Sequence, residues 1–583
     1  MSDTEVFATT CTNNCGGRCL INVHIREGQV VRIESDQSAD EPGGFLAMRA
    51  CLRGRSYRQI LYHPDRLKYP QKRVGKRGEG RFERITWDEA TTIIAGEIRR
   101  VTAKYGALSL YNNYARGARG TNNSPYWVNR LLSLYAGDYL EFYGTYSSGQ
   151  SSYATPLTYG TLATGSHRET WQKSKLIILM GSNPAEMISG TNTMYYLRLA
   201  KEAGARIVAV DPRYSDTAVA VADEWIPIRP TTDSALLSAM AYVIVSEGLH
   251  NQHFLDTYCV GFDEEHLPSD VPAGNSYRAY LFGETDGEVK TPEWAEKITG
   301  IPAERIRGLA REYATSKPAA LILGLGQQRH ANGEQSVRSA TVLASLTGNV
   351  GVEGGWASGS GGRGVGVHVG SIPVPGGNTK ISCFLWTDAV LRGTLMTAKK
   401  DRIQGAERLP ANIKLIINPG GNSLINQHSD INRTRKILED ESLVEFIVAS
   451  DIFLTPSARF ADLLLPAASQ YERDNIMVAM GGDTAYYNRP LVAPLYECRD
   501  EYDWLSDVAE KLGIKEEFTE GRSIVAWMRH LCEPTAAAHP DFPGFDEFRR
   551  RGVFRTRYTG PRVAFADQIA DPENHKFPTP SGK

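Results

Sequence analysis

The chain contains 583 residues, enough for roughly three to five domains of ordinary size. Hydrophobic residues make up 41% and charged residues 23%, values that exclude a disordered or collagen-like chain. The formal net charge is -2, so no global basic excess indicates a nucleic-acid or membrane-surface partner, and no apolar run of ~18 residues would span a bilayer.

Residues 1–70 are expected to form a small β-rich domain, because short alternating stretches at 19–25 and 29–33 are separated by Gly and Pro turns. Residues 71–175 are expected to form an α/β region. Within it, Thr86 and Glu89 have the spacing of a capping box and predict a helix whose apolar face includes Ile94 and Ile98.

Residues 176–350 alternate between strands and helices. Strands are predicted at 176–180, 206–210 and 225–228, and helices at about 193–202 and 233–246. Such alternation indicates a largely parallel sheet. The fold class is therefore α/β, with this segment as a first dinucleotide-binding-like half.

Residues 351–410 are expected to be a glycine-rich connector, since nine glycines fall between 351 and 370; such a loop serves either as a lid or as a plain linker. Residues 411–583 repeat the earlier order of elements, with strands predicted at 413–417 and 445–449 and a helix near 429–439. Gly181 and Asp211 are 30 positions apart, and Gly420 and Asp451 are 31. This internal repeat predicts a second dinucleotide-binding-like half.

Four of the eight cysteines lie close together at the N-terminal end of the chain, namely Cys11, Cys15, Cys19 and Cys51. Three bunched thiolates with a remote fourth favour an iron–sulfur cube, although tetrahedral zinc or metal-free thiols stay open on spacing alone. The other four cysteines are scattered, as is typical of buried apolar residues.

Each half places a glycine turn after a strand, where backbone N–H groups can hold a phosphate, and an acidic residue after the next strand, where it can accept from a ribose or base. Neither turn matches G-x-G-x-x-G, and one copy alone is better explained by tight turns and helix caps. Two copies at matching spacing favour a pair of nucleotide-like ligands, or one ligand held by two similar halves.

Several motifs along the chain together resemble the molybdopterin oxidoreductase superfamily, and within it the catalytic A subunits of anaerobic dimethyl sulfoxide reductases. They are Cys11-Thr-Asn-Asn-Cys-Gly-Gly-Arg-Cys19, Arg49-Ala-Cys-Leu-Arg-Gly-Arg-Ser56, the segment from Arg77 to Ala90, Asp211-Pro-Arg-Tyr-Ser-Asp-Thr217, Gln328-Arg-His-Ala-Asn-Gly-Glu334 and Asn426-Gln-His-Ser-Asp430. The resemblance implies one 4Fe-4S cluster on the four N-terminal cysteines and molybdenum held by bis(molybdopterin guanine dinucleotide), one dinucleotide per half.

The family carries its molybdenum ligand in a Tyr-Ser-Ser or Tyr-Ser-Thr turn, which resembles Tyr146-Ser147-Ser148 here. By resemblance Ser147 is the metal ligand, with Ser148 as its neighbouring alternative. No cysteine lies between Cys51 and Cys259, and no aspartate between Asp138 and Asp211, either of which a thiolate- or carboxylate-ligated relative would need near this turn.

The resemblance also implies roles for residues around the cofactors. Arg53 would assist electron transfer between cluster and pterin, and Tyr114 would face the substrate. His330 and His428 either bond the pterin or are ordinary loop histidines. The implied cofactor contacts are Gly181, Asn183, Asp211, Arg213, Asp233, Gly326, Arg329, Gly421, Asn422 and Asp451.

The implied activity is removal of an oxygen atom from an S-oxide or N-oxide in anaerobic respiration. The implied partners are an iron–sulfur electron-transfer subunit and a membrane anchor subunit. Selenate or nitrate reduction, a non-catalytic electron-relay subunit and a zinc-stabilised interaction module are the alternatives.

Relatives continue into a C-terminal β-barrel domain, which we expect to be absent here because the sequence stops at Lys583 without completing an element. They also act at the periplasmic face of the cytoplasmic membrane, whereas no secretory leader precedes Cys11; a native N-terminus would indicate the cytoplasm.

Overall fold

A computed structural model describes residues 4–13, 15–36, 47–115, 120–187, 192–359, 366–479, 483–556 and 560–583. The chain forms two compact units. Unit 1 comprises Met1–Tyr146, Gly366–Ala479 and Asp483–Thr556; unit 2 comprises Ser147–Val365, Met480–Gly482 and Arg557–Lys583. This division differs from the five consecutive segments expected from the sequence. Each unit is assembled from stretches of chain that are distant in sequence.

The N-terminal part of unit 1 is a small antiparallel sheet, as expected for residues 1–70. Its strands are β1 (Glu5–Thr10), β2 (Leu20–Arg26) and β3 (Gln29–Ser35), in that order. Two short helices follow, α1 (Leu52–Arg55) and α2 (Tyr57–Leu61). The cysteine loop connects β1 to β2, so the sheet holds both ends of that loop.

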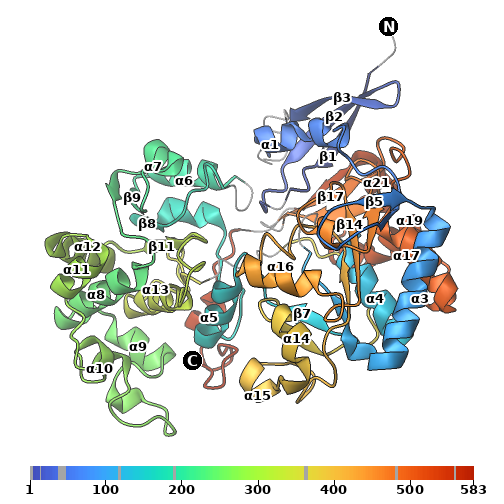
Figure 1. Ribbon diagram of the computed structural model, residues 1–583. Helices are drawn as coiled ribbons and strands as arrows, with labels where there is room; N and C mark the ends of the chain where they lie inside the picture. Colours follow the sequence, from blue (N-terminus) through green and yellow to red (C-terminus); the bar gives the residue numbers. More distant parts are fainter. Residues whose placement is uncertain are drawn as a thin grey trace. The chain divides into compact units, whose positions relative to one another are not determined.

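The main sheet of unit 1 has six strands in the order β5-β4-β15-β14-β13-β6. Strands β6 (Leu110–Asn112), β13 (Leu415–Asn418), β14 (Phe446–Asp451) and β15 (Leu463–Pro466) are parallel, and the hairpin β4 (Gln71–Arg73) and β5 (Phe82–Arg84) extends the edge antiparallel. One face packs on α3 (Trp87–Tyr105), α4 (Ser124–Ala136) and α17 (Glu501–Leu512), and the other on α14 (Trp386–Arg392) and α16 (Ile431–Glu439) (Figure 1). The repeat half predicted at 411–583 thus shares its sheet with the N-terminal part of the chain.

Smaller elements complete unit 1. They are the parallel pair β7 (Glu141–Tyr143) and β12 (Lys380–Ser382), the sheet of β16 (Asn475–Val478), β17 (Thr484–Asn488) and β18 (Val553–Arg555), and the helices α15 (Ala398–Asp401), α18 (Lys515–Thr519), α19 (Ile524–Leu531), α20 (Glu533–Ala538) and α21 (Phe545–Arg551). Short 3-10 turns lie at Ala107–Ser109, Gly393–Leu395 and Ala458–Phe460.

Unit 2 is built on a four-stranded parallel sheet in the order β10-β9-β8-β11, formed by β8 (Leu176–Met180), β9 (Arg206–Val210), β10 (Glu224–Ile226) and β11 (Ala319–Leu323). Helices α8 (Asp233–Ser246), α11 (Pro292–Thr299), α12 (Ala303–Thr315) and α13 (Glu334–Leu346) pack on one face. Helices α6 (Thr193–Glu202) and α7 (Asp216–Val221) lie on the other (Figure 1). The remaining helices are α5 (Gly149–Tyr159), α9 (Gln252–Tyr258), α10 (Tyr277–Leu281) and α22 (Ala566–Ala570), with 3-10 turns at Arg168–Lys173 and Glu264–His266.

Most of the predicted local structure is confirmed. Thr86 and Glu89 form the reciprocal capping box at the start of α3, and α8 begins and ends at the predicted residues. The strand predicted at 225–228 begins and ends earlier, at Glu224–Ile226, because Pro227 has no N–H for the sheet. Sheet order confirms the parallel α/β expectation.

The segment expected as a connector contains packed structure in its described part. β12, α14 and α15 lie within it, and Trp386 and Val390 are fully buried in unit 1. Near its start, a Cβ at Gly354 would lie 2.8 Å from Pro318, and one at Gly355 would lie 2.3 Å from the carbonyl oxygen of Asn349. These glycines therefore permit close backbone packing. Residues 360–365 lie outside the described residues.

Candidate functional site: two half-sites and a cysteine loop

The four N-terminal cysteines lie at the ends of regular elements. Cys11 follows β1, Cys19 precedes β2, and Cys51 is the N-cap residue of α1. The N–H of Cys11 donates to the carbonyl of Cys19 at 3.1 Å, which closes the loop. Left-handed backbone at Gly16 (φ 76°) and Arg18 (φ 47°) reverses the chain within it.

The thiols interact electrostatically with one another. Burial raises the pKa of Cys19 to about 12, and the charges of Cys11, Cys15 and Cys51 add to this shift. The pKa of Cys11 is raised for the same reason. The raised pKa values of Cys11 and Cys19 favour their protonated forms in the metal-free chain, so cluster assembly must release these two protons.

Among the residues that the structure describes, no three His, Cys, Asp or Glu side chains converge on one metal-ion position. This finding does not bear on an iron–sulfur cube, in which each thiolate binds a different iron. The N–H of Gly17 donates to the sulfur of Cys15 at 3.4 Å, and a Cβ at Gly54 would lie 3.2 Å from the sulfur of Cys11. The loop therefore has both a sulfur hydrogen bond and the small residue that a cluster site needs.

Unit 2 contains the first of the two predicted phosphate-binding glycine turns. β8 ends at Met180, and Gly181 (φ 54°) donates its N–H to the carbonyl of Val210 at 2.9 Å. The side-chain oxygen of Asn183 accepts from both the N–H (3.2 Å) and the hydroxyl (2.7 Å) of Thr217. Asn183 thereby ties the glycine turn to the loop after the next strand.

Unit 1 repeats the asparagine contacts of this arrangement. β13 ends at Asn418, and Gly420 and Gly421 have positive φ angles of 108° and 88°. The side-chain oxygen of Asn422 accepts from the N–H (2.9 Å) and the hydroxyl (2.7 Å) of Ser457. We call these two pairs, Asn183–Thr217 and Asn422–Ser457, the Asn–hydroxyl clamps.

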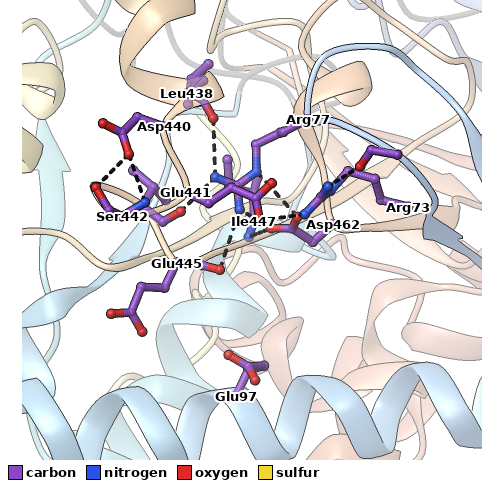
Figure 2. A network of polar contacts seen from close by, with 12 residues as sticks. Arg73, Arg77, Glu97, Leu438, Asp440, Glu441, Ser442, Glu445, Ile447 and Asp462 are labelled. Carbon is purple, nitrogen blue, oxygen red and sulfur yellow. Dashed lines mark hydrogen bonds and ion pairs between the residues drawn. The ribbon is translucent and has the colours of Figure 1, made fainter.

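A second pair of equivalent contacts lies at Ala222-Asp223 and Ala461-Asp462, which hold matching positions in the two repeats. Asp223 accepts the N–H of Ile207 at 2.8 Å in unit 2, and Asp462 accepts that of Ile447 at 2.8 Å in unit 1. Asp462 is also bonded by Arg73 and Arg77 from the β4–β5 hairpin, as Figure 2 shows. The two halves thus share this contact between an aspartate and a strand N–H. In unit 1 two arginines also bond the aspartate.

The acidic residues that end the second strand of each repeat differ in environment. Asp211 accepts the N–H of Arg213 at 2.9 Å, while the exposed Arg213 side chain pairs with Glu186. Burial raises the pKa of Asp451 to about 6; its Oδ1 accepts the N–H of Ile452 at 2.7 Å, whereas its buried Oδ2 has no partner among the described residues.

Other predicted contacts gather around the Gly181 turn within unit 2. Asp233 is buried at the start of α8, and its pKa is raised mainly by burial, against a lowering influence of His330. Gly326 lies in the loop after β11, and the Arg329 Nε donates to the carbonyl of Ser147 at 2.8 Å. Both follow the strand next to β8, so the sheet brings them to the same edge.

The turn with Ser147 is held at both of its ends. On the unit 1 side, the Tyr146 hydroxyl donates to the carbonyl of Cys383 at 2.6 Å and bonds His428 at 3.0 Å. On the unit 2 side, Gln328 donates to the carbonyl of Ser147 at 2.9 Å, alongside Arg329. These contacts restrict the backbone that precedes and includes the serine.

The structure places Tyr114 and Arg53 in different environments. Tyr114 is 1% exposed and its hydroxyl bonds that of Thr145 at 2.8 Å, so it supports the turn from within the core. Arg53 lies exposed in α1, two residues after Cys51. Among the scattered cysteines, Cys383, Cys498 and Cys532 are buried and Cys259 is partly buried, in line with an apolar role.

Sequence reasoning missed Gln327 and Ser457, and it assigned no role to Gln328 and Thr217, although both lie in the quoted motifs. Gln327 is 5% exposed, both its amide atoms are without a partner among the described residues, and its oxygen would lie 2.8 Å from a Cβ at Gly181. The only signal was its place between Gly326 and Arg329. The unpartnered polar atoms of Gln327 and Asp451, next to glycine turns, fit a bound polar cofactor in each half.

The two half-sites define a protein that holds a polar cofactor group in each half, and the chain belongs to the molybdopterin oxidoreductase family. The family model "Molybdopterin oxidoreductase" matches residues 66–511, and "Molybdopterin oxidoreductase Fe4S4 domain" matches residues 4–63. Molybdopterin-bound molybdenum and one 4Fe-4S cluster are therefore its cofactors.

Within this family the chain groups with the dimethyl sulfoxide reductases. It is 45% identical over 600 residues to "Dimethyl sulfoxide reductase DmsA" of Escherichia coli (strain K12), covering 100% of this chain and 73% of that protein. It is 31% identical to "Dimethyl sulfoxide/trimethylamine N-oxide reductase" of Cereibacter sphaeroides, over 90% of this chain and 67% of the relative.

A solved structure has the same fold. The acetylene hydratase from Pelobacter acetylenicus matches 99% of this chain and 77% of its own, with a TM-score of 0.73 at 21% identity. At that identity the likeness concerns the fold alone. Within the described residues, no helix is both long and apolar enough to cross a membrane.

Proposed function

We propose that this chain is the catalytic subunit of a respiratory reductase that removes the oxygen atom from S-oxides or N-oxides of the dimethyl sulfoxide type. The overall reaction consumes two electrons and two protons and releases a sulfide or amine and one water. The supporting observation is 45% identity to DmsA along the whole chain. Bound molybdenum would supply the oxygen-atom exchange, and the cluster the one-electron steps.

Specific residues of the chain would hold these groups. Ser147 is the proposed molybdenum ligand because of its place in the Tyr146-Ser147-Ser148 turn, whose backbone Gln328 and Arg329 hold by bonding the Ser147 carbonyl. Cys11, Cys15, Cys19 and Cys51 would bind the cluster. Arg53 would assist electron transfer from it.

The pterin dinucleotides would be held by one set of residues in each unit. Gly181, Asn183, Asp211, Arg213, Asp233, Gly326 and Arg329 would serve one, and Gly421, Asn422 and Asp451 the other. The acidic residues would accept from a ribose or guanine N–H. Asn183 and Asn422 have already engaged their side-chain oxygens in the clamps, so their proposed contribution is to hold the glycine turns in place.

The remaining proposals concern the setting of the enzyme. Electrons would arrive from an iron–sulfur subunit linked to a membrane anchor subunit, at the periplasmic face of the cytoplasmic membrane. The five segments expected from the sequence, with boundaries at 70, 175, 350 and 410, remain our proposal for how the cofactor-binding parts are divided along the chain.

The first experiment counts molybdenum, iron and zinc in purified protein and assays it with dimethyl sulfoxide, trimethylamine N-oxide and selenate. We expect one molybdenum and about four irons per chain, with turnover of the first two compounds. Selenate turnover alone would support the rival reductase, and iron without molybdenum would support an electron-relay subunit.

A matched pair of variants tests the ligand assignment. We expect Ser147→Ala to lose turnover and change the X-ray absorption spectrum of molybdenum, because an oxygen ligand disappears. Ser148→Ala should retain both. The reverse pattern would move the ligand to Ser148.

A further inference from the structure

The loop between β15 and β16 in unit 1 carries buried polar atoms without partners. Ser469, Gln470 and Tyr471 are 2%, 6% and 1% exposed. The Ser469 hydroxyl, the Gln470 Nε2 and the Tyr471 hydroxyl have no hydrogen-bond partner among the described residues. Three such atoms in successive residues are unusual, since leaving a buried donor unmet costs about 1–3 kcal/mol each.

This loop lies directly against the cysteine loop. The Gln470 oxygen accepts the N–H of Thr12 at 3.0 Å, across 458 residues of sequence, and also bonds the Thr12 hydroxyl. Thr12 immediately follows Cys11. The Tyr471 ring packs edge-to-face on Tyr57 with centroids 5.4 Å apart, and both rings share a buried cluster with Cys11.

Each of the two side chains keeps a donor. The amide oxygen of Gln470 is occupied by Thr12, so its NH₂ group remains. The Tyr471 hydroxyl carries one O–H donor, and its ring lies in the same buried cluster as Cys11. Two donors therefore lie on the segment that packs against a ligand of the 4Fe-4S cluster.

We propose that Gln470 and Tyr471 donate hydrogen bonds to sulfur atoms of the bound 4Fe-4S cluster and thereby raise its reduction potential. This rests on the cluster that the family match assigns to the four cysteines. Taking up one electron increases the negative charge on the sulfurs, so donors stabilise the reduced cluster more than the oxidised one. Both are positioning residues for the potential, supplied by a segment far from the cysteines in sequence.

The test is a redox titration of the holoenzyme monitored by electron paramagnetic resonance, using Gln470→Leu and Tyr471→Phe. At the wild-type midpoint we expect the ratio of reduced to oxidised cluster to fall roughly three- to tenfold in each variant; tenfold corresponds to about 59 mV for one electron. Tyr487→Phe is the matched control. It also removes a buried hydroxyl, which bonds Asp474 at 2.8 Å, and should leave the midpoint unchanged.

A second measurement covers variants that lose the cluster. Electron–nuclear double resonance of the reduced wild type in H₂O and D₂O should show exchangeable protons coupled to the cluster, and Tyr471→Phe should lack one of them. Unchanged midpoints in variants that retain about four irons would overturn the proposal. So would an absence of exchangeable couplings, or a set of couplings in Tyr471→Phe that is identical to that of the wild type. A wild type without iron would instead refute the cluster itself.

Discussion

Arg77 offers a direct test of how the second half is held together. Its side chain is fully buried; it donates to Asp462 at 2.6 Å and to the carbonyls of Leu438 (3.2 Å) and Val444 (2.7 Å) (Figure 2). Asp462 in turn accepts the N–H of Ile447 in β14, the strand that ends at Asp451. Replacing Arg77 by alanine removes every one of these donors together.

The expected effect is large because Asp462 loses one of its two arginines, and the carbonyls of Leu438 and Val444 lose a charged donor. Arg73 remains on Asp462 at 2.8 Å, so the carboxylate keeps one ion pair with a partly exposed partner. Breaking a buried ion pair from one side costs about 3–5 kcal/mol when the remaining charge has no other partner, so we expect about 3 kcal/mol here. At 1.4 kcal/mol per factor of ten, this equals roughly two powers of ten in the local opening equilibrium.

Hydrogen exchange followed by mass spectrometry measures this opening around Ile447. We expect Arg77→Ala to lower the protection of β14 and β15 by that factor, up to the limit of global unfolding, while the exposed control Arg81→Ala leaves it unchanged. In an Asp462→Asn background the same change should cost less, because it then breaks no ion pair with residue 462. Equal protection in Arg77→Ala and wild type would refute the reasoning.

Two further predictions concern the half-site in unit 1. Burial raises the pKa of Asp451 to about 6, so folding favours the protonated carboxyl group. The contribution of this group to the free energy of unfolding is therefore full below about pH 4. It is lost as the pH rises through about 6. Asp451→Asn should therefore flatten the decline of the melting temperature of cofactor-free protein over this window, and an unchanged pH profile would contradict the assignment. Ser457→Ala should loosen the 420–426 turn and lower the molybdenum content, because Asn422 loses a donor and the N–H of Ile425 loses its acceptor. Ser457→Thr, which copies Thr217 of the other half, should restore both; loss of molybdenum in the threonine variant as well would argue against the clamp.

The paired clamps explain how one fold presents two similar half-sites. In both units a side-chain oxygen of asparagine bonds the N–H and hydroxyl of a Ser or Thr that lies beyond the next strand. Asn183 and Asn422, which the sequence patterns assigned to cofactor contact, therefore also hold the glycine turns in place. Gln328 and Arg329 have a comparable function for the Ser147 carbonyl.

Local elements were predictable from the chain because their signals are short-range. The capping box at Thr86, the extent of α8 and the parallel strands of both repeats follow from spacing and periodicity over a few residues. The predicted end of a strand was less accurate next to a proline, as at Pro227, where the strand ends at Ile226. The hydrogen bond between the hydroxyls of Tyr114 and Thr145 could not be predicted, because the two residues lie on separate segments of the chain.

By itself the sequence determined the four-cysteine loop, the internal repeat and the family motifs, since covalent spacing and residue type carry those signals. Only the tertiary structure decided that Gln470 meets Thr12, that Arg77 meets Asp462 across 385 residues, and that the side chains of Gln327 and Asp451 keep unpartnered atoms. Such contacts depend on which polar groups remain buried without water once distant segments pack, and that has no periodic signature in the chain.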